Sequence, residues 1–258
     1  MKHNYKMILS YDGSRYFGWE HQPNTEMTIQ GKLELVLSRI LYGEDYRPKD
    51  FASCPVTVIG AGRTDAGVHA RAMTANVILD TDLTEDALRN MMNRYLPEDI
   101  SINELKICSD RFHSRFNASG KTYRYTCYYG SSKPVFERKY LTVLEYHPDL
   151  DRVREAAALL MGEHDFKSFC GNSHMKKSTV RNVDSIEITE TGPYIRFYYH
   201  GNGFLQNMVR IMTGTLLEIG SGKRRPEEIT AILDAKDRKM AGYTAEAAGL
   251  CLMKVDYD

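Results

Sequence analysis

The chain has 258 residues, which is enough for one large domain or two small ones. Its residues are 42% hydrophobic and 26% charged, as in ordinary globular proteins, and no apolar run is long enough to span a membrane. The 5 cysteines form no Cys-x-x-Cys pair, and such an odd, scattered set argues against a disulfide framework.

The charge balance is even, with 34 basic and 34 acidic residues. Zero net charge does not by itself indicate a nucleic-acid-binding protein, but the distribution of charge matters more than its sum. Basic residues gather in four stretches, at 111–124, 133–139, 176–181 and 223–225. These stretches are either ordinary solvated faces or parts of one basic surface, and the sequence leaves both interpretations open.

Apolar periodicity and turn residues predict the elements of the first half. In chain order they are a strand at 6–11, a helix at 28–41, a loop at 44–54, strands at 56–59 and 73–79, a helix from residue 84, and a strand at 100–107. Thr28 and Thr84 are the expected N-caps of the two helices, and Pro97 ends the second one.

The second half gives a similar series. In chain order it has a strand at 122–129, a helix capped by Asp151, strands at 183–188 and 194–199, a helix at 204–219, a helix from Pro226, and a strand at 250–257. The residues Glu190-Thr191-Gly192-Pro193 predict the turn between the two middle strands. Gly220 is the expected stop of the long apolar helix.

Both halves therefore follow the order strand, helix, strand, strand, helix, strand, which is the split βαβ pattern. We infer an α+β fold made of two such halves, residues 1–110 and 111–258. They are expected to join into a central mixed or antiparallel sheet, with helices on one face and an active cleft on the other.

A glycine-rich loop follows the predicted strand at 56–59. Its 11 residues, from Gly60 to Ala70, include 3 glycines and enclose a single carboxylate, Asp65, two residues after Arg63. Such a loop at a strand end is a candidate catalytic site. Two other interpretations stay open: an Asp that bonds turn amides, as Asp commonly does, and a phosphate-binding loop, although the P-loop spacing is missing.

Several motifs of this chain resemble those of one family. The segment Gly62-Arg63-Thr64-Asp65-Ala66-Gly67-Val68-His69-Ala70 resembles the signature loop of the tRNA pseudouridine synthase A family. Its other motifs have counterparts here in the same order, at 11–13, 17–19, 28–31, 121–125, 201–204, 208–210 and 249–250. One glycine-rich loop would be a weak signal, whereas this ordered set covers the chain almost end to end.

The resemblance implies isomerisation of uridine to pseudouridine in the anticodon stem-loop of tRNA, at tRNA positions 38, 39 and 40. It also implies the pseudouridine synthase fold and a homodimer. The reaction exchanges no net water or electrons, so we expect no cofactor, nucleotide or metal. A paralogue with a different RNA target and an RNA-binding protein without catalysis are the alternatives. No signal-peptide core begins the chain, so we expect a cytoplasmic protein.

The resemblance also implies the catalytic residues. Asp65 would attack a sugar carbon or assist its deprotonation, and the sequence does not decide between those routes. Burial would drive this carboxyl toward its neutral form unless a cation offset the desolvation. By resemblance that cation is Arg210, which lies on an otherwise apolar helix; the alternative is an arginine that reaches solvent. Tyr123 would stack on the target base, whereas Tyr125 is expected in the core.

Other residues would bind RNA or support the site. Arg63 would hold a backbone phosphate or take the place of the flipped nucleotide. His69, Gln206 and Asn207 are candidates for RNA contacts or for supporting positions, and Leu250 would line the uracil pocket. His164, Cys170 and His174 are close in sequence, but their spacing fits no zinc pattern, so no metal site is expected.

The chain departs from the family at two places. Glu20-His21 stands where the family usually has Gln-Arg, and Glu246 stands where a proline is common. Neither change touches the expected chemistry. The first replaces a cation near the entry by an acid, so its consequence concerns RNA binding.

Overall fold

The computed structural model describes residues 2–48 and 54–258, so residues 49–53 of the predicted loop at 44–54 lie outside the described part. The described residues contain ten strands and five α-helices, which is an α+β fold with mixed sheet. The chain forms two compact units: unit 1 is Met1–Ser119 with Leu252–Asp258, and unit 2 is Gly120–Cys251. The closing strand, which the sequence placed with the second half, thus belongs mainly to unit 1.

Unit 1 is built on one part of the sheet. Its strands are β1 (Lys2–Tyr11), β2 (Ile59–Gly60), β3 (His69–Asp80), β4 (Ile100–Cys108) and β10 (Leu250–Tyr257). They lie in the order β4-β1-β3-β10, and β2 also pairs with β3. In β1 the side chains of Tyr5, Met7, Leu9 and Tyr11 are buried and the residues between them are not, which is the period of two that a strand with one apolar face requires.

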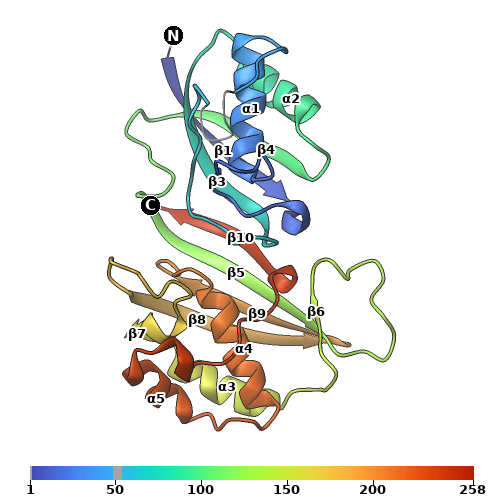
Figure 1. Ribbon diagram of the computed structural model, residues 1–258, viewed down its shortest axis with the longest axis vertical. Helices are drawn as coiled ribbons and strands as arrows, with labels where there is room; N and C mark the ends of the chain where they lie inside the picture. Colours follow the sequence, from blue (N-terminus) through green and yellow to red (C-terminus); the bar gives the residue numbers. More distant parts are fainter. Residues whose placement is uncertain (1, 49–53) are drawn as a thin grey trace. The chain divides into compact units, whose positions relative to one another are not determined.

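Two helices complete unit 1 and lie side by side in Figure 1. They are α1 (Ile29–Tyr42) and α2 (Glu85–Tyr95). Both begin as predicted: the Thr28 hydroxyl accepts a hydrogen bond from Gly31 N, and the Thr84 hydroxyl accepts one from Ala87 N. These caps satisfy amides that the first helical turn leaves without partners.

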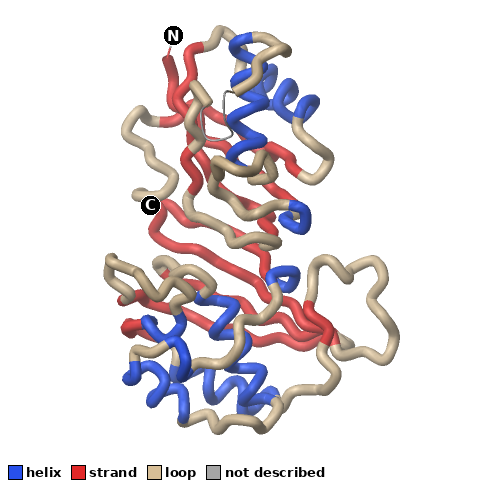
Figure 2. The backbone as a smooth tube through the Cα atoms, in the orientation of Figure 1, coloured by secondary structure: helices blue, strands red, loops and turns tan. Residues whose placement is uncertain are grey.

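Unit 2 has a similar design. Its strands are β5 (Ala118–Tyr128), β6 (Thr142–Val143), β7 (Gly162–Asp165), β8 (Val180–Thr191) and β9 (Tyr194–Gly201), and its helices are α3 (Leu150–Leu159), α4 (Met208–Gly220) and α5 (Glu228–Ala235). The strands lie in the order β5-β9-β8-β7, with β6 parallel to β5. A long loop, tan in Figure 2, joins β5 to β6. The order β5-β9-β8 repeats the order β1-β3-β2 of unit 1, as the two-halves prediction requires.

Several predicted boundaries differ from the structure, and three of them have a clear structural cause. The strand expected at 56–59 is only Ile59–Gly60, because side chains of α1 take the backbone hydrogen bonds: Val58 N donates to Glu34 and Val58 O accepts from Gln30. The N-cap of α3 is Asp149, and not Asp151, whose own amide donates to the Asp149 carboxylate.

The third wrong boundary is the start of α4. This helix begins at Met208 rather than at 204, because Asn207 has a left-handed backbone, with φ of 58°, that cannot continue a helix. The two short strands β6 and β7 were not predicted. Such short segments form strands only beside a longer one, and here β6 pairs with β5 and β7 pairs with β8.

Candidate active site

The loop that joins β2 to β3 carries Asp65. The amide N of Val68 donates a hydrogen bond of 3.1 Å to the carbonyl O of Asp65, which closes a four-residue turn. Gly67 has a φ of +79° at the third position of this turn, where a type II turn requires glycine because a side chain would be strained. The turn leaves Asp65 partly exposed and Arg63 exposed.

The opening motifs of the chain hold this loop in place. An added Cβ on Gly13 would lie 2.0 Å from the carbonyl O of Val68, and one on Gly18 would lie 2.7 Å from the carbonyl O of Thr64. Gly18 also has a φ of +99°, and the next amide, of Trp19, donates to Thr64 O over 3.1 Å. Only glycine lets the two backbones come this close, so these motifs and the Asp65 loop are parts of one substructure.

Thr64 and His69, which lie on either side of Asp65 in the sequence, have buried side chains that support the loop. The hydroxyls of Thr64 and Tyr11 share a buried hydrogen bond of 2.9 Å. The His69 ring is 4% exposed, its Nδ1 accepts from Gly13 N over 3.1 Å, and the same nitrogen lies 3.2 Å from the Asp12 carboxylate. Of the two roles expected for His69, its burial favours support of the loop over direct contact with RNA.

Arg63 makes an ion pair with the carboxylate of Glu20. Both side chains are well exposed, at 60% for Arg63 and 46% for Glu20. The guanidinium therefore reaches solvent beside the loop, where a phosphate could approach it. Its partner Glu20 belongs to the dipeptide Glu20-His21, the first of the two departures noted in the sequence.

In unit 2, Arg210 is held by two hydrogen bonds that fix the orientation of its guanidinium. Its Nε donates to the carbonyl O of Ala245 over 2.7 Å, and its Nη1 donates to Oδ1 of Asn207 over 2.9 Å. The side chain is half-buried, so Arg210 is not an arginine that simply extends into water. Asn207 thus contacts the candidate catalytic arginine, which favours a supporting position for it over an RNA contact.

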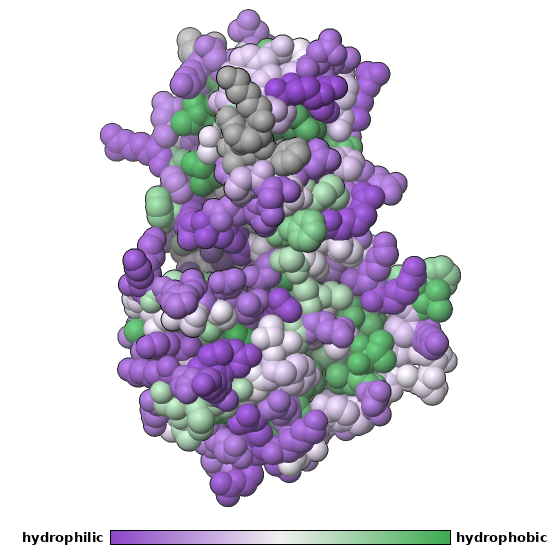
Figure 3. Space-filling view, in the orientation of Figure 1, coloured by the Kyte–Doolittle hydropathy of each residue, from purple (hydrophilic) through white to green (hydrophobic). Residues whose placement is uncertain are grey.

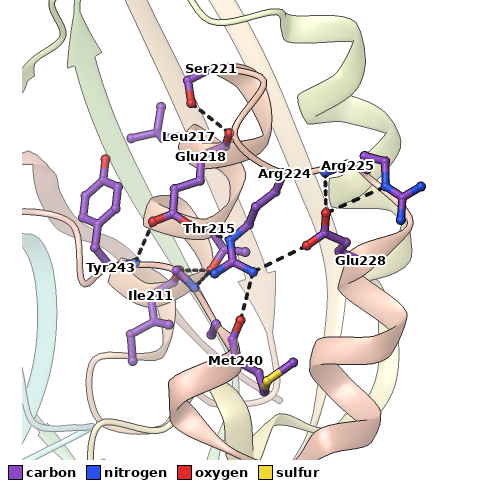
Figure 4. A network of polar contacts seen from close by, with 12 residues as sticks. Ile211, Thr215, Leu217, Glu218, Ser221, Arg224, Arg225, Glu228, Met240 and Tyr243 are labelled. Carbon is purple, nitrogen blue, oxygen red and sulfur yellow. Dashed lines mark hydrogen bonds and ion pairs between the residues drawn. The ribbon is translucent and has the colours of Figure 1, made fainter.

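The segment that carries Ala245 packs closely on α4. An added Cβ on Gly214 would lie 2.0 Å from the carbonyl O of Tyr243, and Ala245 N donates to Arg210 O over 3.1 Å. Figure 4 shows the polar network at the other end of this contact, where Arg224 joins Glu218 of α4 to the carbonyl O of Met240. The helix and the segment therefore hold the Arg210 guanidinium between them.

Tyr123 lies on β5, is 8% exposed, and meets the ring of Phe204 edge-on with centroids 5.3 Å apart. Tyr125, two residues further along, is fully buried in the core as expected, and its hydroxyl bonds the Thr142 hydroxyl and the Glu246 carbonyl O. Burial raises the pKa of Tyr125 well above its ordinary value, so this phenol stays protonated. Phe204 was not singled out beside Tyr123, since nothing local links the two residues.

The remaining candidates divide between surface and core. Gln206 is exposed, and its carbonyl O accepts from Gly171 N over 2.8 Å. Leu250 is 4% exposed, and its place in a uracil pocket stays a prediction. Asp65, Arg63 and His69 lie in unit 1, whereas Arg210, Tyr123, Gln206, Asn207 and Leu250 lie in unit 2. The pairing of Asp65 with Arg210 joins residues of different units and stays a prediction.

Comparison with known proteins identifies the family. A family model described as tRNA pseudouridine synthase matches residues 7–117 and 156–258. The tRNA pseudouridine synthase A of Bacillus sp. (strain KSM-64) is 42% identical over 254 residues, which cover 98% of this chain and 99% of that protein. The protein of the same name from Syntrophotalea carbinolica is 39% identical over 252 residues, covering 98% and 95%. The chain belongs to the tRNA pseudouridine synthase family.

Membership confirms the resemblance on which the motifs were interpreted, and it confirms the α+β pseudouridine synthase fold. The protein is an RNA pseudouridine synthase. A solved structure titled "Crystal Structure of a Cbf5-Nop10-Gar1 Complex" aligns with 96% of this chain and 49% of that chain at 11% identity, but a TM-score of 0.36 is too low to support any conclusion.

The described residues contain neither a metal-ligand cluster nor a membrane-spanning helix. In residues 2–48 and 54–258, no three His, Cys, Asp or Glu side chains gather as metal ligands do. Within the same ranges, no helix has the length and apolar character needed to cross a membrane.

Proposed function

We propose that this pseudouridine synthase modifies the anticodon stem-loop of tRNA at tRNA positions 38, 39 and 40, with Asp65 as its nucleophile. The observation that carries the proposal is the construction of the Asp65 loop. Two glycines of the opening motifs, Gly13 and Gly18, meet its backbone too closely for any other residue. The loop thus presents one carboxylate at a fixed place, which a catalytic group requires.

Asp65 attacks the sugar carbon that bears uracil, or removes a proton from the adjacent carbon. In either route the bond from N1 to the sugar breaks, and the uracil turns so that C5 bonds to the same sugar carbon. C5 then loses its proton, N1 gains one, and Asp65 is restored, so atoms and electrons balance within the nucleotide. The half-exposed position of Asp65 suits a carboxylate that must be ionised before RNA covers it.

The other candidates have distinct roles. Arg210 supplies the positive charge that keeps a covered carboxylate ionised, and its two fixed hydrogen bonds aim the guanidinium before RNA arrives. Tyr123 stacks on uracil, an interaction worth about 1–3 kcal/mol per base that tolerates rotation of the base. Its contact with Phe204 fixes the angle of the ring. Arg63 contacts the RNA backbone beside the site.

The protein acts in the cytoplasm as a homodimer. Light scattering of the purified chain tests the homodimer, because a dimer has twice the mass of one chain. A single-chain mass at micromolar concentration would exclude the dimer.

A pseudouridine map of total cellular RNA with and without the protein tests the proposed function. The expected result is the loss of pseudouridine at tRNA positions 38, 39 and 40 in cells that lack the protein, restored when the gene is returned. Loss at other tRNA or RNA positions would retain the reaction and replace the target. An unchanged map would overturn the function.

A further inference from the structure

The ion pair between Glu20 and Arg63 stands beside the candidate catalytic loop and has no role in the chemistry proposed above. The guanidinium Nη2 of Arg63 donates to a carboxylate oxygen of Glu20. The two side chains lie at the surface of unit 1, 60% and 46% exposed. Arg63 is only two residues from Asp65, so any RNA phosphate that approaches the loop meets this pair.

The backbone that carries Glu20 is tied to the rest of unit 1 on both sides of the residue. Before it, Trp19 N donates to Thr64 O over 3.1 Å and Trp19 O accepts from Gln30 N over 2.9 Å. After it, His21 N donates to Oε1 of Gln30 over 3.2 Å. Glu20 is therefore fixed on the same substructure as Arg63, and the pair does not depend on a mobile loop.

The neighbouring His21 is occupied elsewhere. Its Nδ1 lies 3.1 Å from the carboxylate of Glu34, whose side chain is 2% exposed. That carboxylate also accepts from Gln30 Nε2 over 2.8 Å and from Val58 N over 2.9 Å. In this dipeptide, His21 therefore contacts the buried Glu34 carboxylate, whereas Glu20 pairs with Arg63.

A glutamate carboxylate and an RNA phosphate are both anions whose oxygens can accept two hydrogen bonds from a guanidinium. We propose that the Glu20 carboxylate competes with the RNA backbone phosphate for the guanidinium of Arg63, and that it thereby lowers RNA affinity. This inference rests on the proposed function, in which Arg63 contacts RNA. The phosphate must displace the carboxylate, and the released Glu20 then repels it.

The competition is weak enough to be overcome in every binding event. An exposed ion pair changes an equilibrium constant by only about two- to fivefold, because both charges are well solvated when apart. Glu20 can therefore lower RNA affinity without preventing binding.

The test is the variant Glu20→Gln, which keeps the shape of the side chain and removes its charge. The dissociation constant for an unmodified tRNA transcript is measured over a series of KCl concentrations. We expect binding about two- to fivefold tighter than wild type at low salt. The slope of log affinity against log salt should become steeper by up to about one unit, since no freed carboxylate takes up a cation.

The matched control is Asp86→Asn. Asp86 is 82% exposed and pairs with Arg89 at 3.1 Å in the same unit, so this variant also removes one negative charge and one exposed ion pair. It should bind the transcript as wild type does. Equal gains in both variants would attribute the effect to net charge and overturn the proposal.

Arg63→Ala and the double variant Glu20→Gln with Arg63→Ala complete the cycle. Loss of the Glu20 charge should give no gain in affinity where Arg63 is absent. A gain that persists without Arg63, or no gain in Glu20→Gln itself, overturns the proposal. Binding alone is measured, so failure of the proposed function, seen as an unchanged pseudouridine map, remains a separate outcome.

Discussion

At the scale of single residues, what matters is a carboxylate that protrudes from a turn whose backbone is fixed by other residues. The groups around Asp65 contribute hydrogen bonds and close backbone contacts, as those of Thr64, Gly67 and Val68 show. The hydrogen bond that closes the turn uses the backbone carbonyl of Asp65, so a change of the Asp65 side chain leaves that bond in place.

We expect Asp65→Asn to abolish pseudouridine formation while the fold is retained. An amide is neither a nucleophile nor a base at neutral pH, so the rate on a tRNA transcript should fall by at least about a thousandfold. Asp82→Asn is the matched control, since Asp82 is exposed and lies on the same unit outside the loop. Normal turnover by Asp65→Asn, with its melting temperature unchanged, would remove Asp65 from the mechanism.

At the scale of elements, α4 depends on a segment that comes much later in the chain. Residues 240–245 lie against the helix at Gly214 and provide the carbonyl O of Ala245 that holds Arg210. The same segment is fixed at Met240 by Arg224, as Figure 4 shows. The orientation of a candidate catalytic side chain therefore depends on the packing of backbone on backbone.

Gly214→Ala should disturb that packing. The new Cβ would lie 2.0 Å from the carbonyl O of Tyr243, and a backbone atom cannot rotate away. We expect a loss of about 1–3 kcal/mol in the free energy of unfolding, as for overpacked sites, together with lower activity. Gly203→Ala is the control for stability, because its Cβ would have only ordinary contacts beyond 3.8 Å with Arg181. Equal melting temperatures of the two variants would refute the packing argument.

Asp165 joins the end of β7 to two other parts of unit 2. The hydroxyl of Thr179 donates to it, Lys236 lies 3.2 Å from it, and the amide of Lys167 is capped by it. The Thr179 hydrogen bond, followed by the Lys236 charge, lowers the pKa of Asp165 below its ordinary value. A carboxylate whose folded pKa is lowered adds stability above its unfolded pKa, and that contribution is lost as pH falls through the folded pKa.

Asp165→Asn should therefore cost about 1 kcal/mol of unfolding free energy at pH 7, a modest value because the side chain is 26% exposed. The difference from wild type should shrink as the pH falls below about 4, where the wild-type carboxylate becomes protonated. Urea unfolding at several pH values measures this. Asp151→Asn, at a carboxylate that is 95% exposed, is the control. A difference that is constant with pH would mean that Asp165 stabilises through shape alone.

At the scale of the whole molecule, the chain returns to the unit in which it began. Residues 252–258 belong to unit 1, and their Tyr257 ring lies 5.1 Å from the ring of Phe112 and beneath the ammonium of Lys6. The Tyr257 hydroxyl donates to Ser114 O over 2.7 Å, and burial raises its pKa to about 12. Residues 252–258 are therefore part of the packing of unit 1.

Tyr257→Ala should lower the free energy of unfolding by about 2–4 kcal/mol through lost packing. Tyr257→Phe keeps the ring contacts and removes one hydrogen bond, at a cost of about 0.5–1.5 kcal/mol. Thermal melts of the two variants distinguish the contributions. If both variants melted with wild type, the closing strand would not be part of the stable core of unit 1.

The surface shows where the fold leaves apolar side chains uncovered. Apolar groups gather at the right of Figure 3, and the β5–β6 loop and β6 carry Val135, Phe136, Tyr140 and Val143 as exposed apolar residues. Scattered exposed apolar residues are normal in a single chain, whereas contiguous patches mark interaction sites. The light-scattering measurement above is the direct test of whether two chains associate.

The sequence by itself determined the features whose causes are local. Thr28 and Thr84 cap helices because a hydroxyl three residues ahead of an amide can reach it, and β10 was predicted with its observed limits from an apolar run after Gly249. The ordered motifs also sufficed for the family and for the Asp65 loop. These signals need only neighbours in sequence.

Only the tertiary structure decided the features whose partners are distant in sequence. Nothing near Val58 shows that Glu34 and Gln30 take its hydrogen bonds, and nothing near Arg63 shows that Glu20 pairs with it. The start of α4 likewise depends on Asn207, whose left-handed backbone accompanies close contact with Gly171. These hydrogen bonds and element limits arise because segments far apart in sequence compete for the same donors and the same space. A local sequence pattern does not contain that information.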